Sequence, residues 1–222
     1  MADEVNTMAA AVDDGNLGGV LAQRRAKAEQ MRADGINLYG HRVDNLTSVA
    51  AVRAAFQPTP EGAEPPTYTL AGRLMARRIM GKSLFANLKD ESGSIQFYLQ
   101  RQEVGDEQYA FFKSLDIGDI FAITGFPFMT RTGELSIHVK SFELLSKSLL
   151  PLPEKFHGLQ DQEQRYRQRY VDLICNDDSR RVLALRSKIV QACREFLAER
   201  GFMEVETPIL QTLAGGVAAR RR

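Results

Sequence analysis

The sequence predicts a protein of the β + α class, in which an N-terminal helix precedes a five-stranded β-barrel and further helices follow it. Three observations support this prediction. Apolar residues alternate at period two through much of 67–145, helical spacing holds on either side, and loops rich in proline separate the parts. The predicted division is 1–64 for the N-terminal helix and loop, 65–146 for the barrel, 147–160 for a linker, and 161–222 for the start of a further domain.

The totals are those of an ordinary globular chain. Charged residues make up 26% and apolar residues 44% of the 222 residues, enough for one large domain or two small ones. The net charge of +1 means that any nucleic-acid surface must come from a local cluster of cations. No apolar run reaches membrane length and the first residues do not resemble a secretory signal, so we expect a cytoplasmic location.

The cysteines and histidines predict neither a disulfide nor a metal site. Cys175 and Cys193 lie in helical patterns without CxxC spacing, so we expect reduced thiols that act as small core residues. The three histidines are scattered and do not have the spacing of metal ligands.

The N-terminal part predicts a basic helix and a loop. Helical spacing runs from Asn16 to Asp34, and Gly35 follows as a stop signal. Its apolar side is thin, so a solvated helix is slightly favoured over an arm that binds a nucleic-acid backbone. Its charged side holds several cations, namely Arg24, Arg25, Lys27 and Arg32. A short helix over 48–56 then leads into the loop QPTPEGAEPP.

The middle of the chain predicts five strands and one helix. The strands are expected at 68–79, 84–89, 95–99, 119–125 and 134–144, and the helix at 108–115. Three strands, a helix and two strands is the element order of the OB-fold, a five-stranded Greek-key barrel. The face formed by strands 2 and 3 of that fold binds oligonucleotides.

Alternation assigns the two faces of these strands. The residues expected to face the core are Leu84, Ala86, Leu88, Ile95, Phe97, Leu99, Leu135, Ile137 and Val139. The residues expected on the outer face are Phe85, Gln96, Tyr98, Glu134, Ser136 and His138. Arg77, Arg78 and Lys82 add cations from the preceding segment. An exposed ring beside amides and cations suits single-stranded nucleic acid, because it offers stacking, edge contacts and phosphate contacts.

The last part predicts elements of an incomplete domain. A charged helix is expected over 161–174, and a second helix from a cap at Asp177 or Asp178 to Arg200. A strand over 202–207 follows and ends before Pro208. The charged helix carries three arginines that we expect to tie it to the two domains by ion pairs rather than to contact RNA, namely Arg165, Arg167 and Arg169.

Several segments together carry a specific resemblance. They are GRLMARRIMGKSLFANLKD, GSIQFYLQ, TGELSIH, LLPLPEKFHGLQDQEQRYRQRYVDLI and GFMEVETPIL. They closely resemble bacterial-type lysyl-tRNA synthetase, a family of class II enzymes, from about Asn16 to Ala219. The resemblance identifies 65–146 as an anticodon-binding OB-fold domain and 161–222 as the start of a class II synthetase α+β catalytic domain that ends just after motif 1.

The resemblance implies a tRNA-binding site on the outer face. It assigns Phe85 to stacking on an anticodon base and Arg78 to a base or phosphate contact, while Lys82 is equally well read as a solvated charge. Gln96 and Glu134 are implied contacts to the anticodon, Gln96 to the edge of a base and Glu134 to a base or ribose donor. An amide both donates and accepts hydrogen bonds and a carboxylate only accepts, so which of the two reads the central uracil of a lysine anticodon stays open.

The resemblance also implies partners and cofactors outside the barrel. GFMEVETPIL matches the first signature motif, so Phe202, Val205 and Pro208 are implied residues of a homodimer interface, or of an interface with the full-length synthetase. Gly215 and Gly216 match part of a loop that encloses the substrate lysine.

The motifs that carry the ATP site lie beyond the matched segments. ATP and Mg²⁺ are therefore expected only for the full-length family enzyme, with no cofactor in this chain. The chain alone is expected to bind tRNA without catalysing aminoacylation. Two alternatives stay open: a sequence-tolerant OB protein that binds single-stranded nucleic acid, and a non-catalytic dimerisation fragment.

Overall fold

The computed structural model describes residues 17–58, 60, 63–153, 159 and 161–208. The chain divides into two compact units, Met1–Gly158 and Leu159–Arg222. Each unit is described by itself below.

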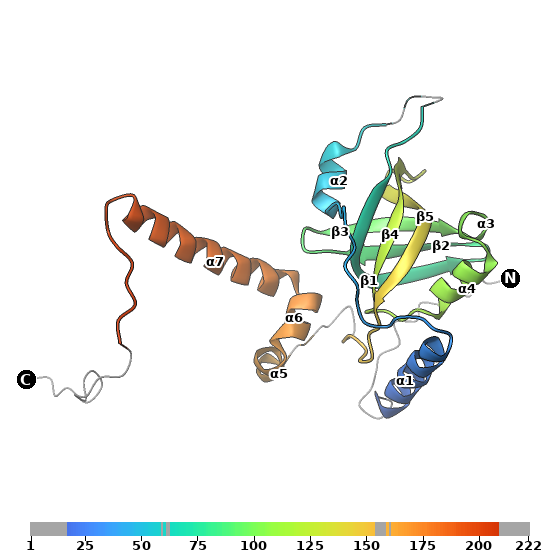
Figure 1. Ribbon diagram of the computed structural model, residues 1–222, viewed down its shortest axis with the longest axis horizontal. Helices are drawn as coiled ribbons and strands as arrows, with labels where there is room; N and C mark the ends of the chain where they lie inside the picture. The colour runs from blue at the N-terminus through green and yellow to red at the C-terminus, as the bar shows by residue number, and fades with distance from the viewer. Residues whose placement is uncertain (1–16, 59, 61–62, 154–158, 160, 209–222) are drawn as a thin grey trace, which may run out of the picture. The chain divides into compact units, whose positions relative to one another are not determined.

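The first unit is built on a closed five-stranded barrel (Figure 1). Its strands are β1 (Tyr68–Met80), β2 (Ser83–Lys89), β3 (Ser94–Gln100), β4 (Ile120–Met129) and β5 (Leu135–Ser146). They follow the order β1-β2-β3-β5-β4 around the barrel, with β3 and β5 parallel and every other pair antiparallel. This is the OB-fold arrangement, and the predicted fold is confirmed.

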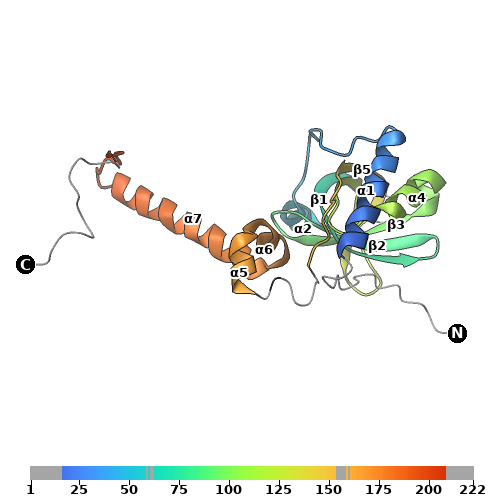
Figure 2. The same cartoon turned by 90° about the horizontal axis from the view of Figure 1, so that it is seen from below.

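Four helices accompany the barrel. They are α1 (Leu17–Ala33), α2 (Val49–Ala55), α3 (Arg101–Val104) and α4 (Asp106–Ser114). Helix α3 was not predicted, because the sequence predicted a single helix in this part of the chain, over 108–115. Helix α1 lies beside α4 in both ribbon views (Figures 1 and 2), and the Lys27 ammonium donates to the Ser114 carbonyl at the end of α4.

The barrel interior confirms the predicted inward face of β2 and β3. The six expected core residues on these strands are all at most 3% exposed. Phe97 contacts Phe112 of α4 and Phe121 of β4, with ring centroids 5.7 and 5.4 Å away. Because side chains alternate along a strand, burying this set fixes Phe85, Gln96 and Tyr98 on the opposite face.

Strand β4 is longer than the sequence predicted. It continues past Gly125 through Pro127 to Met129, because β5 stays paired with it along the whole length. The register shifts between Thr124 and Gly125, and a Cβ added at Gly125 would lie 2.0 Å from the His138 carbonyl oxygen. Glycine is therefore required at this bulge. Gly125 and Pro127 interrupt the alternation of apolar residues, so the sequence pattern did not predict this part of the strand.

Helix α1 is docked on the barrel and is not the solvated helix that the sequence favoured. Arg24 is only 8% exposed. Its guanidinium donates to the carbonyl oxygens of Ile117, Ser148 and Leu150, at 3.1, 3.2 and 3.0 Å. A buried arginine bound to three carbonyls ties the helix to two loops, which hydrophobicity patterns do not reveal.

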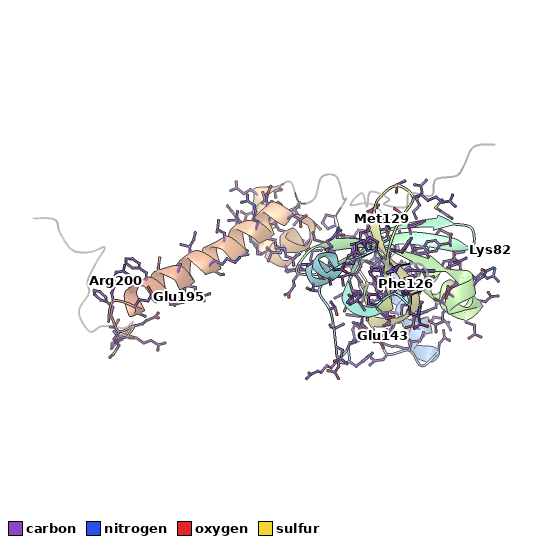
Figure 3. The ribbon with its side chains drawn as sticks, turned by 90° about the horizontal axis from the view of Figure 1, so that it is seen from above. Lys82, Phe126, Met129, Glu143, Glu195 and Arg200 are labelled. Atoms are coloured by element: carbon purple, nitrogen blue, oxygen red, sulfur yellow. The ribbon has the colours of Figure 1, made fainter. Side chains whose placement is uncertain are left out.

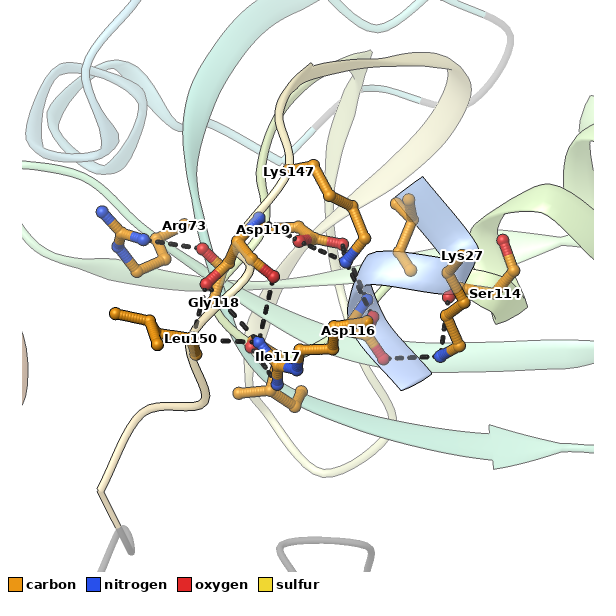
Figure 4. Close-up of polar contacts among 12 residues, drawn as sticks. Lys27, Arg73, Ser114, Asp116, Ile117, Gly118, Asp119, Lys147 and Leu150 are labelled. Carbon is orange, nitrogen blue, oxygen red and sulfur yellow. Dashed lines mark hydrogen bonds and ion pairs between the residues drawn. The ribbon is translucent and has the colours of Figure 1, made fainter. Parts of the chain in front are cut away.

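A buried charge cluster lies where α1 meets the same two loops (Figure 4). The Lys147 ammonium, whose side chain is fully buried, lies 2.7 Å from the Asp116 carboxylate and 2.9 Å from that of Asp119. Asp116 also accepts a hydrogen bond from Lys27 of α1, at 2.7 Å. The cluster therefore connects α1, the loop before β4 and the segment after β5.

Acid weakens this cluster. Burial raises the pKa of Asp116, but hydrogen bonds from Lys147 and Lys27 outweigh it, and the net pKa is lowered from the ordinary value. A lowered folded-state pKa stabilises the fold fully above the unfolded-state value, and this stabilisation is lost as the pH falls through the folded-state value.

The second unit contains α5 (Gln162–Arg167), α6 (Arg169–Cys175) and α7 (Asp177–Ala198). The single helix predicted over 161–174 is wrong, because Gln168 leaves helical geometry with φ −114° and ψ 52°. The predicted cap at Asp177 or Asp178 is also wrong, because the Asn176 side chain accepts from the N–H groups of Asp178 and Ser179.

The three arginines of α5 and α6 form ion pairs, as predicted, and those observed lie within this unit. Arg165 and Arg169 both bind the Asp172 carboxylate, which is 1% exposed, at 3.0 and 2.7 Å. Arg167 pairs with Glu163 one turn earlier. The shared carboxylate holds α5 against α6.

The end of the second unit is exposed. The strand predicted over 202–207 is absent from the described residues, because no described strand lies beside this segment to bond its backbone. The apolar stripe of α7 also faces solvent, with Leu185 at 48% and Ile189 at 55% exposed. Cys193 is exposed as well, which corrects its prediction as a core residue.

The buried charge cluster gives a stability prediction. We expect Asp119→Ala to lower the free energy of unfolding by about 3–5 kcal/mol, because it removes a carboxylate from the buried Lys147 ammonium and from two backbone N–H groups. Urea titration followed by circular dichroism measures the change. The control Asp106→Ala breaks an exposed ion pair with Arg101 and should move the midpoint little. Equal midpoints for the two variants would contradict this account.

Candidate nucleic-acid interface

A groove of about 1240 Å³ crosses the outer face of the barrel. Strands β1, β2 and β3 form its floor, and the β4–β5 turn forms one wall. The lining residues that bear on the argument are Arg78, Phe85, Asn87, Gln96, Tyr98, Phe128, Arg131 and Glu134. The groove therefore brings together four of the five predicted binding residues: Arg78, Phe85, Gln96 and Glu134.

An aromatic cluster forms one part of this face. Phe85 and Tyr98 are cross-strand partners on β2 and β3, with ring centroids 4.9 Å apart. The Tyr98 ring centroid also lies 6.2 Å from that of Phe128 and 5.3 Å from that of His138. Partly exposed rings held by their neighbours provide a pre-ordered platform on which a base can stack.

His138 contributes an apolar surface to this cluster. Burial lowers the pKa of His138, nearby Lys140 lowers it further, and Glu103 partly opposes them. Its Nε2 atom is buried, and no hydrogen-bond partner for it is found among the described residues. The lowered pKa favours the neutral imidazole, so His138 contributes a ring rather than a cation to the cluster.

A chain of hydrogen bonds connects the polar residues of the groove. The Gln96 Nε2 amide donates to the Glu134 carboxylate at 3.0 Å. The Ser136 hydroxyl donates to the Gln96 Oε1 oxygen at 2.9 Å. The sequence placed Ser136 on the outer face, but Ser136 is completely buried because the Gln96 side chain lies against its hydroxyl. Gln96 and Glu134 thus form one unit.

The two adjacent arginines of β1 have different surroundings. Arg78 is exposed and is the cross-strand partner of Phe85. Arg77 instead donates to the carbonyl oxygens of Phe112, Lys113 and Leu115, at 3.0, 2.8 and 2.8 Å. Arg77 therefore caps the end of α4, and Arg78 is the arginine beside the stacking platform. Neighbouring residues on a strand face opposite ways, so only one of the two shares the face of Phe85.

Two further cations stand near the groove. Lys82 is exposed in the β1–β2 turn and does not line the groove, although both of its chain neighbours do. In Figure 3 it lies at the rim of the barrel, apart from Phe126 and Met129 of β4. Arg131 in the β4–β5 turn does line the groove. The sequence missed Arg131 and Phe128 because the predicted fourth strand ended at Gly125.

The predicted residues outside the barrel fall into two groups. Phe202, Val205 and Pro208 are described and exposed, the first two at 65% and 64%. Gly215 and Gly216 lie outside the described residues.

Neither a metal-binding cluster nor a membrane-spanning helix is found among the described residues. No group of three histidine, cysteine or acidic side chains is placed to hold a metal ion within the described ranges. None of the described helices is long and apolar enough to cross a membrane.

Two family models match the sequence. Residues 68–145 match an OB-fold nucleic acid binding domain, and residues 161–221 match the class II tRNA synthetases of the D, K and N group. The chain therefore combines an OB-fold barrel with part of a class II synthetase region.

Curated relatives define the family more narrowly. The chain is 48% identical over 207 residues to a lysine–tRNA ligase of Bacillus subtilis, a match that covers 92% of this chain and 42% of the relative. Lysine–tRNA ligases of Thermoanaerobacter and Halalkalibacterium halodurans are 49% and 45% identical, again over 92% of this chain. The chain thus belongs to the lysyl-tRNA synthetase family, and spans about two fifths of the length of these relatives.

The contrast between the two arginines gives a paired prediction. Arg77→Met should lower the free energy of unfolding by about 2 kcal/mol, because three carbonyls of the α4 end lose a charged donor. Arg78→Met should leave unfolding unchanged and reduce the slope of log affinity against log salt for a single-stranded RNA by about 0.7. Denaturant titrations and salt titrations of both variants test this. The reverse pattern would show that the two roles are exchanged.

Proposed function

We propose that this chain binds the anticodon loop of a lysine tRNA through the groove of its barrel. The observation that supports the proposal most strongly is the juxtaposition, on one face, of the Phe85–Tyr98 platform, the Gln96–Glu134 pair and the exposed guanidinium of Arg78. An unpaired loop needs these three functions: rings for stacking, polar edges for reading bases, and positive charge for phosphates.

The class of RNA follows from the family. The relatives are lysine–tRNA ligases, and the matched barrel is a nucleic-acid-binding domain. In the whole enzyme, which acts in the cytoplasm, the barrel positions the tRNA while a catalytic domain attaches lysine with ATP and Mg²⁺. The groove supplies recognition and takes no part in the chemical step.

A second proposal concerns self-association. We propose that the exposed apolar stripe of α7 and the segment Phe202–Pro208 form a dimerisation surface, because they are exposed and the segment matches the first signature motif of the family. Arg194 of α7 binds Glu204 at 2.9 Å, which holds this segment beside the end of the helix. Phe202 and Val205 are large apolar residues that gain free energy when a partner surface covers them.

Stacking on Phe85 can be measured directly. Phe85→Ala should weaken binding of an RNA stem-loop with a UUU anticodon by about 1–3 kcal/mol, the usual contribution of one stacked base. Fluorescence anisotropy with the 222-residue chain measures this affinity. Tyr39→Ala, which removes an exposed ring outside the groove, is the matched control. A folded Phe85→Ala variant with the parent affinity would remove Phe85 from the site.

Self-association has its own test. The parent chain should show a concentration-dependent dimer in sedimentation equilibrium, and Val205→Asp should shift it towards monomer because a dimer would then bury an unpaired charge. Ser187→Asp, which adds the same single negative charge at an exposed position of α7, controls for net charge. A parent chain that stays monomeric at all concentrations, or a Val205→Asp variant that dimerises equally well, would contradict the proposal.

A further inference from the structure

We propose that Ser136, buried behind the groove, is a positioning residue that determines base specificity. Together with Glu134 it holds the Gln96 side-chain amide in the orientation that pairs with uracil and not with cytosine. This inference rests on the proposed function, because it concerns how the same groove distinguishes two pyrimidines.

A side-chain amide is ambiguous by itself. Its oxygen accepts and its nitrogen donates, and a rotation of the amide group by 180° exchanges the two positions. Uracil offers an N–H donor at N3 beside carbonyl acceptors, whereas cytosine offers an acceptor at N3 beside an amino donor. A glutamine that can rotate therefore pairs with either base, and discrimination requires that the rotation be prevented.

The surroundings of Gln96 prevent this rotation. Glu134 as a carboxylate can only accept, so the Nε2 side of the amide must face it, and the two atoms are 3.0 Å apart. The opposite orientation would bring the Oε1 oxygen against the carboxylate, which is repulsive. Glu134 therefore sets the direction of the amide.

Ser136 holds the other end in place. Its hydroxyl lies 2.9 Å from Gln96 Oε1, and the two residues are direct partners in the parallel β3–β5 pairing. Glu134 stands in an exposed turn, but Ser136 is completely buried, so its oxygen has a fixed position in the barrel. The amide is thus bonded at both ends before any ligand binds.

The Gln96 amide can still form two hydrogen bonds with a base. Nε2 carries a second hydrogen and Oε1 a second lone pair, and Gln96 lines the groove. The free lone pair suits the N3–H of uracil, and the free N–H suits the neighbouring carbonyl. Cytosine would place its amino group opposite the Nε2–H donor of Gln96 and its N3 acceptor opposite Oε1, so neither hydrogen bond forms.

The test compares two stem-loops that differ only in the central anticodon base, UUU and UCU. Anisotropy titrations of the 222-residue chain give the ratio of the two affinities. Ser136→Ala should reduce this ratio about fivefold or more, because the Gln96 amide is then bonded only to a carboxylate in an exposed turn and can move with it out of the alignment that distinguishes uracil from cytosine. Ser136→Thr, which keeps the hydroxyl, should preserve the ratio.

Two further variants keep the test decisive. Ser83→Ala removes a hydroxyl that lines the same groove but donates to the Met80 carbonyl rather than to Gln96, and it should leave the ratio unchanged. Glu134→Gln keeps the size of the side chain and accepts Gln96 in either orientation, so it should reduce the ratio even if Ser136→Ala fails to fold.

Three outcomes would count against the inference. Equal weakening of both stem-loops by Ser136→Ala would show a purely structural role. An unchanged ratio in Glu134→Gln would show that the amide orientation is not fixed by its partners. A parent chain that binds neither loop would overturn the proposed function itself, and this inference with it.

Discussion

Burial of alternate residues on β2 and β3 is the constraint on which the rest of the structure depends. Leu84, Leu88, Phe97 and Leu99 are fully buried inside a closed barrel. A shift of either strand by one residue would bring Phe85 and Gln96 into the core and move these apolar side chains into water, at a cost of several kcal/mol. The same burial that holds the barrel together therefore presents the platform and the polar pair to solvent.

The cations of the first unit divide into two groups with different roles. Arg24, Lys27, Arg77 and Lys147 bind backbone carbonyls or carboxylates and tie helices to the barrel. Arg78 and Arg131 line the groove and face solvent. A net charge of +1 is therefore compatible with a locally basic groove, because binding depends on which cations stay accessible rather than on their total number.

Much of the barrel could be predicted from the sequence, because alternation on β2 and β3 is regular and glycine-containing turns separate the strands. The prediction failed where backbone conformation or polar contacts, rather than the alternation of apolar residues, determine the structure. Gly125 and Pro127 interrupt the pattern, so the last four residues of β4, including Phe128, were not predicted. Arg24 was assigned to solvent although carbonyls 93 to 126 residues away bind it. The arrangement around Gln96 could not be predicted either, because it depends on hydrogen bonds with Ser136 and Glu134 that form only when β3 pairs with β5.

The central claim is that the outer face of β2, β3 and the β4–β5 turn is the surface that contacts RNA. The most direct measurement is an NMR titration of the isotope-labelled chain with a UUU anticodon stem-loop. The account predicts that shift changes concentrate on Phe85, Gln96, Tyr98 and the residues of the β4–β5 turn. Shift changes concentrated instead on the basic side of α1, with the groove residues unmoved, would contradict it.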